Sequence, residues 1–196
     1  MSNHGGRVVL VYGAKENGSG VLIDKEQILT AAHLGFTLNN IYKIARNGQE
    51  MDAKCTHICK ALDFAVLSIP EIPMCALGGG SLVPGRSYNI IGYPHSTVQQ
   101  DPTVLEIVLD GINSDGKHYN GIPRPSSDFC GAPVLSKLGS IGGIVVGAVD
   151  KISVETTLLT LTEQPGVLIL PYTTIMAIFL PTKFAENSTP SLIEIQ

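Results

Sequence analysis

Three residues of types that catalyse the cleavage of acyl bonds stand far apart in the sequence: His33, Asp63 and Cys130. A thiolate can attack a carbonyl carbon, an imidazole can take and return the proton, and a carboxylate can hold the imidazole in one tautomer. A thiol with a pKa near about 8.5 is mostly protonated at neutral pH, so the cysteine needs such a base. Taken singly, each residue also fits a structural role, as a hydrogen-bonded histidine, a strand-capping aspartate or a buried thiol. Their occurrence together, in the order His, Asp, Cys, favours nucleophilic catalysis.

The sequence around each of these residues indicates a strand end or a turn. His33 closes the apolar run ILTAAH, which follows a small-residue stretch, GSG, at residues 18–20. Asp63 begins the apolar run DFAVL. Cys130 stands directly before Gly131, and glycine permits sharp turns that other residues avoid. All three side chains are therefore expected where strands meet loops.

The elements that hold these residues are predicted to be short strands. The 196 residues include 21 glycines and 12 prolines, which excludes a long helical bundle. Apolar runs bounded by turn residues recur about every 8–12 residues, which indicates an all-β chain of two small antiparallel barrels packed together. The glycines at 78–80 mark the boundary between the two halves. We expect an N-terminal barrel in residues 1–80, a C-terminal barrel in residues 84–181 and a tail at residues 182–196.

The sequence predicts the secondary structure of three segments in the C-terminal half. A single late helix is predicted over residues 172–180, with Pro181 ending it. Residues 141–149 and 153–161 are predicted as two separate strands. The stretch from 110 to 128 is polar and is predicted as a loop.

Composition excludes several classes of protein. With 44% hydrophobic and 15% charged residues, the chain is not intrinsically disordered. The net charge of −4, without a run of Lys or Arg, disfavours a nucleic-acid partner held by phosphate contacts. The pattern shows no secretory leader and no apolar stretch of the about 20 residues that cross a membrane. The four cysteines are too few for a disulfide framework and are expected as free thiols in the cytoplasm.

The motifs resemble those of chymotrypsin-like proteases. Residues 18–21 and 29–33 resemble the histidine motif, residues 63–67 the aspartate motif, and residues 130–134 (CGAPV) the nucleophile motif, with sulfur replacing a serine oxygen. Residues 143–147 (GIVVG) are similar to the strand that lines the specificity pocket. The cysteine, the short spacings and the small size resemble most the picornain-like cysteine proteases, which process the polyproteins of positive-strand RNA viruses. The resemblance implies an all-β fold of two six-stranded antiparallel barrels with a short C-terminal helix.

The resemblance also implies a role for each residue. Cys130 is the nucleophile, His33 the general base and acid, and Asp63 the group that orients His33, without a cofactor or metal. The backbone N–H groups of Asp128 and Cys130 form the oxyanion hole. The implied partner is an extended peptide, a polyprotein segment that pairs as an added strand. The substrate-binding residues are expected to be Ile144, Val145, Val146 and Gly147.

The sequence departs from the family pattern at three positions. Asp128 stands where the family prefers glycine, two residues before the nucleophile, which leaves the strength of the oxyanion hole open. Val145 stands where glutamine-selecting relatives carry a pocket histidine, and Pro125 stands where they carry a hydroxyl. An apolar pocket wall at Val145 is therefore expected. Cleavage after glutamine stays open, although the sequence ends at Gln196.

Other interpretations remain at this point. Asp128 also fits a protease-like fold that binds peptides with catalysis weakened or lost, and a cellular trypsin-like enzyme with cysteine in place of serine is a further alternative. An RNA-binding side function is disfavoured by the acidic balance. Cys55, His57 and Cys59 are of metal-ligand types, but alternate residues of a straight strand lie about 6.5–7 Å apart, too far for one tetrahedral zinc. A buried core face is favoured there.

Overall fold

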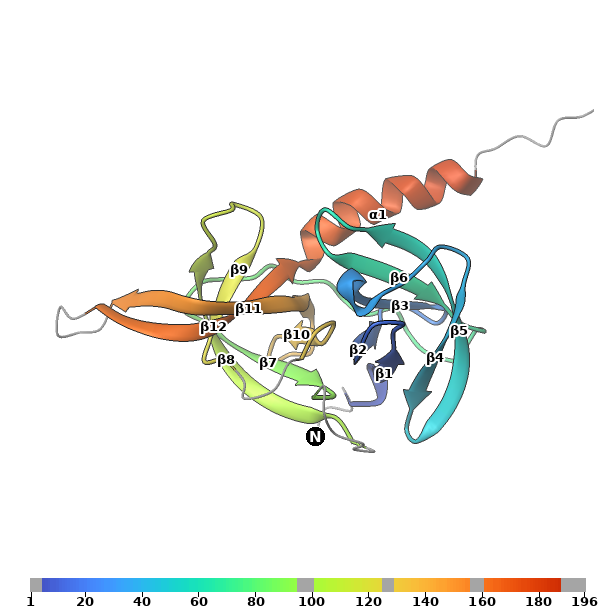
Figure 1. Cartoon of the computed structure of the whole chain (residues 1–196), viewed down its shortest axis with the longest axis horizontal. Coiled ribbons are helices and arrows are strands. Elements are labelled where there is room, and N and C mark those ends of the chain that lie inside the picture. The colour runs from blue at the N-terminus through green and yellow to red at the C-terminus, as the bar shows by residue number, and fades with distance from the viewer. Residues whose placement is uncertain (1–4, 95–100, 125–128, 156–160, 188–196) are drawn as a thin grey trace, which may run out of the picture.

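The computed structural model describes residues 5–94, 101–124, 129–155 and 161–187. Within these residues, twelve strands form two closed antiparallel barrels of six strands each, followed by an α-helix (Figure 1). The two barrels lie side by side, and the helix runs over the outside of the N-terminal barrel. The predicted all-β architecture of two packed barrels with a C-terminal helix is confirmed. In the described part of the chain, no helix is long and apolar enough to span a bilayer.

The N-terminal barrel closes in the strand order β1-β2-β3-β6-β5-β4. Its strands are β1 (Val8–Tyr12), β2 (Asn17–Leu22), β3 (Gln27–Ala31), β4 (Ile41–Arg46), β5 (Gln49–Cys59) and β6 (Phe64–Ser68). Successive residues of a strand point to opposite faces, so alternate aliphatic side chains fill the interior. The interior includes Val9, Val11, Leu22, Ile28 and Leu67. Two single 3-10 turns flank these strands, η1 (Gly5–Arg7) before β1 and η2 (Ala32–Leu34) after β3.

The C-terminal barrel closes in the order β10-β11-β12-β9-β8-β7. Its strands are β7 (Ser87–Gly92), β8 (Thr103–Ile112), β9 (Tyr119–Ile122), β10 (Pro133–Leu135), β11 (Ile141–Glu155) and β12 (Leu161–Pro171). A second apolar cluster, with Tyr88, Ile107, Val134 and Ile169, fills this barrel. The chain passes between the barrels over residues 69–86, and the expected domain limits at 80 and 84 stay a prediction.

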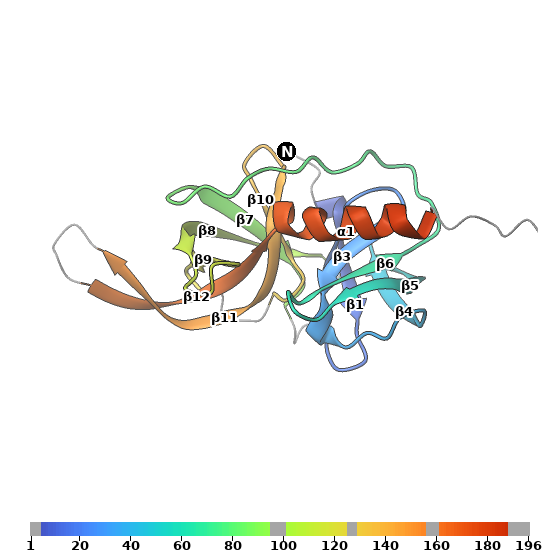
Figure 2. The ribbon, with the colours of Figure 1, turned by 90° about the horizontal axis from the view of Figure 1, so that it is seen from above.

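A third apolar cluster joins the two barrels and the helix. It combines Val21 and Phe64 of the N-terminal barrel with Ile144 of the C-terminal barrel. The helix α1 (Tyr172–Asn187) begins where β12 ends and adds Ile175 and Phe179 to the same cluster. Figure 2 shows α1 crossing from the C-terminal barrel over β3 and β6. The last element of the chain therefore covers the barrel made by its first strands.

The prediction that Pro181 ends the helix is wrong. Helix α1 continues to Asn187, with Pro181 inside it. Proline removes one backbone donor and crowds the preceding turn, a cost of about 3 kcal/mol. The first turns of α1, anchored by Ile175 and Phe179, pack firmly against the barrels, so a helix already held there extends past the proline.

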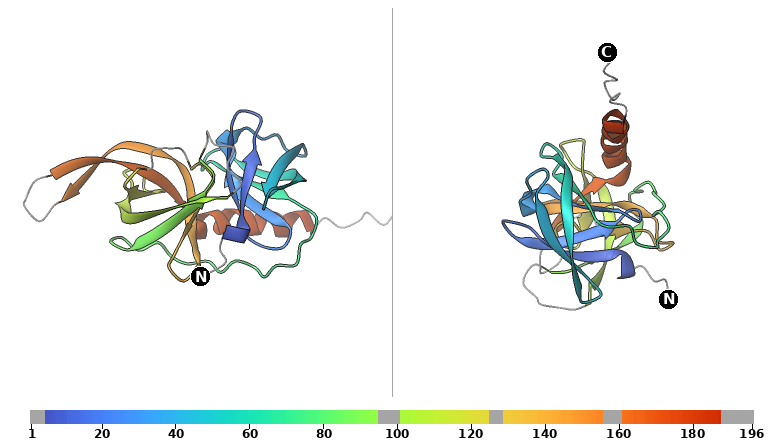
Figure 3. Two further views of the ribbon diagram at one scale, coloured as in Figure 1. Left: turned by 90° about the horizontal axis from the view of Figure 1, so that it is seen from below. Right: turned by 90° about the vertical axis from the view of Figure 1, so that its right-hand side faces the viewer.

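Two predictions about strands also need correction. The strand predicted to end at residue 149 runs on as β11 to Glu155, and a register shift between Val149 and Ile152 accommodates the polar residues there. Figure 3 shows that β11 and β12 extend beyond the barrel as a two-stranded ribbon. The predicted loop at 110–128 contains β9, whose Gly121 lies so close to Ile107 that an added Cβ would be 2.6 Å from its Cδ1 atom. Pairing with β8 and β12, rather than local sequence, makes β9 a strand.

Candidate active site

The pairing of β3 with β6 brings His33 and Asp63 together. The register places Ala31 opposite Phe64, so the residues that follow β3 and precede β6 are neighbours. Asp63 adopts the left-handed backbone conformation, with φ 62°, which aspartate tolerates better than most residues. Its Oδ1 accepts a hydrogen bond of 2.7 Å from the backbone N–H of His33, and its Oδ2 lies 2.5 Å from Nδ1 of the same residue. One carboxylate thus fixes both the backbone and the ring of His33.

The imidazole of His33 is held in its protonated form. Its hydrogen bond with Asp63 and then its hydrogen bond with Cys130 raise the pKa of His33 from 6.5 to about 10, against the opposing effect of burial. Nε2 also lies 3.3 Å from Oε1 of Glu16, in the loop before β2. Because Nδ1 is taken by Asp63, the Nε2 side of the ring faces the sulfur. His33 therefore lies between a carboxylate and a thiol.

A tight turn presents Cys130. Gly131 has a φ of 82°, and a Cβ there would lie 2.0 Å from the carbonyl oxygen of Ser19, so this position requires glycine. The Gly131 N–H donates to the carbonyl of Val145 at 2.7 Å, and the carbonyl of Cys130 accepts from the Ser19 N–H at 2.8 Å. The turn is therefore fixed on one side by β11 and on the other side by β2 of the opposite barrel.

Ser19 joins four segments around this turn. It is fully buried, and its carbonyl accepts a 2.7 Å hydrogen bond from the Thr30 hydroxyl. Its Oγ accepts a 2.8 Å hydrogen bond from the N–H of Tyr93, just after β7. With the bond to Cys130, one small side chain and its peptide groups connect β2, β3, the end of β7 and the cysteine turn. The sequence indicated only a small-residue turn at this position.

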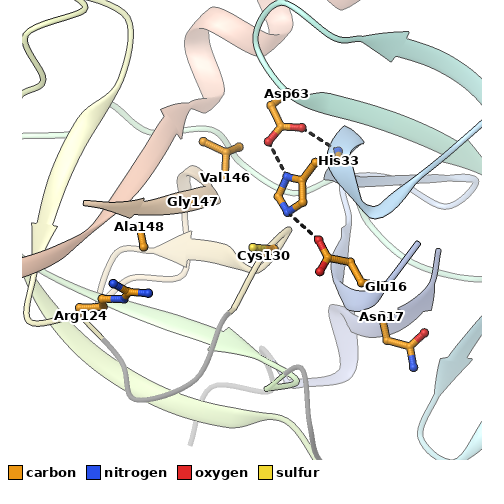
Figure 4. A pocket seen from close by; sticks show the side chains of 9 residues that line it. All are labelled: Glu16, Asn17, His33, Asp63, Arg124, Cys130, Val146, Gly147 and Ala148. Carbon is orange, nitrogen blue, oxygen red and sulfur yellow. Dashed lines mark hydrogen bonds and ion pairs between the residues drawn. The ribbon is translucent and has the colours of Figure 1, made fainter. Parts of the chain in front are cut away.

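The three residues line one pocket between the barrels (Figure 4). Its volume is about 370 Å³. Figure 4 shows Asp63 and His33 on one wall, β11 on the other, and Cys130 between them. The lining residues are Glu16, Asn17, His33, Asp63, Arg124, Cys130, Val146, Gly147 and Ala148.

A family model described as a trypsin-like peptidase domain matches residues 18–148, a segment that contains His33, Asp63 and Cys130. The chain belongs to this trypsin-like peptidase family. Over 146 residues it is 27% identical to serine protease HTRA1A of Danio rerio, and that match covers 70% of this chain but 30% of the relative. The peptidase domain thus spans about a third of the length of that relative.

Solved structures show the same fold. The serine endoprotease from Yersinia pestis has a TM-score of 0.69 at 22% identity, over 94% of this chain and 63% of that one. A human pathogenic astrovirus serine protease has a TM-score of 0.62 at 17% identity, over 86% of this chain and 91% of that one. These two proteins are described as serine proteases, whereas this chain carries Cys130 in the segment that resembles the nucleophile motif.

Only part of the predicted substrate-binding strand faces the pocket of the peptidase domain. Val146 and Gly147 line it, but Ile144 and Val145 do not. The Ile144 side chain is buried between the barrels, and that of Val145 is buried inside the C-terminal barrel. The described contribution of Val145 to the site is the backbone carbonyl that holds Gly131, and substrate binding by its side chain stays a prediction.

Of the two residues predicted to form the oxyanion hole, the structure describes only Cys130. Cys130 is placed by the turn, whereas Asp128 lies outside the described residues, as does Pro125. The contribution of the Asp128 N–H stays a prediction.

Four residues that line the pocket of the peptidase domain were not predicted. Glu16 lies in the loop before β2, Asn17 is the first residue of β2, Arg124 follows β9, and Ala148 lies within β11. The sequence carries a weak signal for two of them. Arg124 precedes the cysteine by six residues in a polar stretch, and Ala148 directly follows the strand compared with the specificity pocket.

The residues of metal-ligand type on β5 are divided between two cores. Cys55 is buried inside the N-terminal barrel, and burial raises the pKa of its thiol to about 11. The ring of His57 packs edge-on against Phe179 of α1, with centroids 4.8 Å apart. A register shift between Cys55 and His57 separates the faces on which they lie. In the part of the chain that the structure describes, no three His, Cys, Asp or Glu residues are grouped as metal ligands.

Proposed function

We propose that this trypsin-like peptidase domain is a cysteine endopeptidase, with Cys130 as nucleophile, His33 as general base and acid, and Asp63 as the positioning carboxylate. The observation that carries the proposal is that Asp63 holds the imidazole of His33 through Nδ1, and that Asp63, His33 and Cys130 line one pocket between the barrels. Catalytic histidines of this kind need both partners, one to fix the ring and one to exchange a proton with it.

The pairing of His33 with Cys130 fits sulfur chemistry. A cation beside a cysteine stabilises the thiolate, which is the nucleophilic form. After Asp63, Cys130 is itself one of the groups that raise the pKa of His33, as expected for an imidazolium–thiolate pair. A serine hydroxyl is far less acidic and needs a neutral imidazole that removes its proton during attack.

The proposed reaction has two stages. The Cys130 sulfur forms a bond to the carbonyl carbon of the peptide, and the negative charge moves to the carbonyl oxygen, which the Cys130 N–H and the Asp128 N–H stabilise. The tetrahedral intermediate collapses as His33 protonates the leaving amine, which leaves a thioester. Water, deprotonated by His33, then attacks the thioester carbonyl, and the peptide acid and the thiol are released. Asp63 keeps the ring in one orientation throughout.

The finer proposal is that the substrate is a viral polyprotein in the host cytoplasm. The sequence motifs with cysteine in the nucleophile position support it, and so do the four cysteines, which are all free thiols. The alternative, a cellular trypsin-like protease with cysteine in place of serine, is supported by the sequence relation to HTRA1A of Danio rerio.

Variants of the three residues test the proposal. We expect no turnover of a peptide library by Cys130→Ala or His33→Ala. We expect reduced but measurable turnover by Asp63→Asn, because a thiolate needs less assistance than an alkoxide. Cys130→Ser keeps the size of the side chain and should also lose most activity, because a hydroxyl is far less acidic than a thiol and forms no stable anion beside His33.

Alkylation with iodoacetamide, mapped by mass spectrometry, gives an independent readout. Cys130 should react faster at mildly acidic pH than the exposed Cys75, and His33→Ala should remove that advantage. Turnover by Cys130→Ala would overturn the proposal. Binding of peptides without turnover by the unaltered chain would favour the binding-module alternative instead.

A further inference from the structure

One cation lies on the wall of the pocket opposite His33. Arg124 follows β9, and its backbone N–H donates to the carbonyl of Pro165 on β12 at 2.9 Å, so its backbone is anchored to the barrel. Its side chain is about one third exposed (35%) and reaches the pocket that contains Cys130. Figure 4 shows the guanidinium beneath Ala148, with Cys130 between it and His33.

The wall around Arg124 is formed by small or apolar groups. Val146 is buried, and Gly147 and Ala148 add little bulk. Among the residues that the structure describes, a Cβ placed on Gly147 would have only the Leu168 Cβ within contact range, at 3.9 Å. An apolar wall with one guanidinium suits a side chain that has a short aliphatic stem and an anionic end. Arginine binds carboxylates with two parallel N–H···O bonds, which gives geometric selectivity as well as attraction.

The chemistry of the proposed reaction decides which substrate residue reaches this wall. The leaving amine must lie at His33, which protonates it. The acyl part of the substrate, which becomes bonded to Cys130, therefore extends away from His33. In Figure 4 that direction leads to β11 and Arg124. The residue before the cleaved bond is thus the one whose side chain meets the guanidinium.

One partner of the Arg124 side chain is an exposed carboxylate that a substrate carboxylate can replace. Nη1 of Arg124 lies 3.1 Å from Oδ1 of Asp150, whose side chain is 93% exposed. Exposed ion pairs of this kind contribute little to stability, so exchanging one carboxylate for another costs little. A lysine or arginine side chain of a substrate would instead meet a like charge on this wall.

We propose that Arg124 selects substrates with an acidic residue, glutamate or aspartate, directly before the cleaved bond. This inference rests on the proposed function and names its substrate class. It differs from the glutamine preference of the enzymes that the sequence resembles, and it assigns the selectivity to a charge on this chain rather than to the position of Val145.

A peptide series tests the inference. The peptides share flanking residues taken from a site cut in a random library and carry Glu, Asp, Gln, Ala or Lys before the bond. We expect kcat/KM for Glu to exceed that for Gln by about 10- to 100-fold, as for hydrogen bonds to charged groups. Arg124→Gln should remove this ratio by lowering kcat/KM for Glu, with little change for Gln. Arg124→Lys should retain part of it, and Arg124→Glu should favour Lys.

Two control variants isolate the guanidinium. Arg86→Gln removes an exposed arginine of the same barrel that does not line this pocket, and should leave the ratio unchanged. Asp150→Asn removes the competing carboxylate and should keep or increase the preference for Glu. Cys130 should still be alkylated before the exposed Cys75 in Arg124→Gln, which shows that the nucleophile is intact.

The outcomes separate the inference from the proposed function. A preference for Gln, Ala or Lys, or a Glu preference that survives in Arg124→Gln, would overturn the role of Arg124 while leaving the peptidase proposal in place. Absence of all turnover would instead contradict the peptidase proposal. In that case binding of the same peptides to Cys130→Ala still decides the inference: the Glu peptide should bind at least about 10-fold more tightly than the Gln peptide, and equal affinities would overturn it.

Discussion

Asp63 controls the charge of His33 because it contacts that residue twice. The bond to the His33 N–H fixes the position of the His33 backbone, and the bond to Nδ1 fixes the orientation of the imidazole ring. A left-handed conformation at Asp63 is needed for both contacts to form at once. The result is an imidazole that keeps its proton through the neutral range, which is the state required beside a thiolate.

The raised pKa of His33 makes part of the stability depend on pH. Because the folded chain binds this proton more tightly than the unfolded chain, the contribution to the free energy of unfolding is complete below pH 6.5, declines as the pH rises, and is lost above the folded-state pKa of about 10. We expect urea unfolding at a series of pH values to show this decline in the unaltered protein and not in His33→Ala. Parallel pH dependences of the two proteins would contradict it.

Residue type and order predicted the catalytic candidates but not the residues that surround them. His33, Asp63 and Cys130 each stand in a motif with a recognisable turn or strand. Arg124 and Glu16 stand in loops without such motifs, and their direction follows from the curvature of the barrels. A charged loop residue looks the same in a sequence whether it faces solvent or a pocket.

Strand β2 carries the contact that places the nucleophile. Ser19 lies on β2, in the N-terminal barrel, yet its N–H holds the carbonyl of Cys130 in the C-terminal barrel. Gly18 must be small here as well, because a Cβ would lie 2.8 Å from the same carbonyl oxygen. The distance between His33 and Cys130 is therefore set by a strand rather than by loops.

Ser19→Ala should destabilise the fold and weaken the site. The substitution leaves the buried N–H of Tyr93 without its 2.8 Å acceptor, which costs about 1–3 kcal/mol. We expect a lower urea midpoint together with slower alkylation of Cys130. Ser114→Ala, at an exposed serine between β8 and β9, is the matched control and should change stability by less than about 0.5 kcal/mol. Equal stability of the two variants would show that the Ser19 hydroxyl is dispensable.

For the strand that borders the pocket, the sequence pattern does not predict which side chains face the pocket. Residues 143–147 are apolar or glycine throughout, so alternation cannot tell which side chains face the pocket. The register with β12 and β10 decides it, and it turns Val145 inward. Strand β9 and the continuation of α1 past Pro181 escaped prediction for a related reason, because partners distant in sequence stabilise both.

A single apolar cluster connects the two barrels and α1, so we expect them to unfold as one unit. Residues of both barrels and the first half of the helix belong to that cluster. Since the pocket has walls from both barrels, a change that loosens the cluster also changes the pocket. The overall architecture was predictable because strand spacing and glycine content point to barrels. The packing of α1 on the N-terminal barrel was not, because a short apolar run does not reveal its partner.

Phe179→Ala tests this connection. Phe179 is 2% exposed and contacts the ring of His57, so its truncation should lower the free energy of unfolding by about 3–5 kcal/mol. Leu180→Ala, at the neighbouring exposed position, should have an effect below about 0.5 kcal/mol. Both are measured by urea unfolding. A single transition for Phe179→Ala is expected, and two separate transitions would show that the barrels fold independently.

The crossing of α1 over the first barrel also has a consequence for the order in which the pocket forms during synthesis. His33 and Asp63 precede β11, β12 and α1 in the sequence, so the opposite wall and the covering helix are made after them. We therefore expect the pocket to be complete only once the chain has been translated and folded through Phe179.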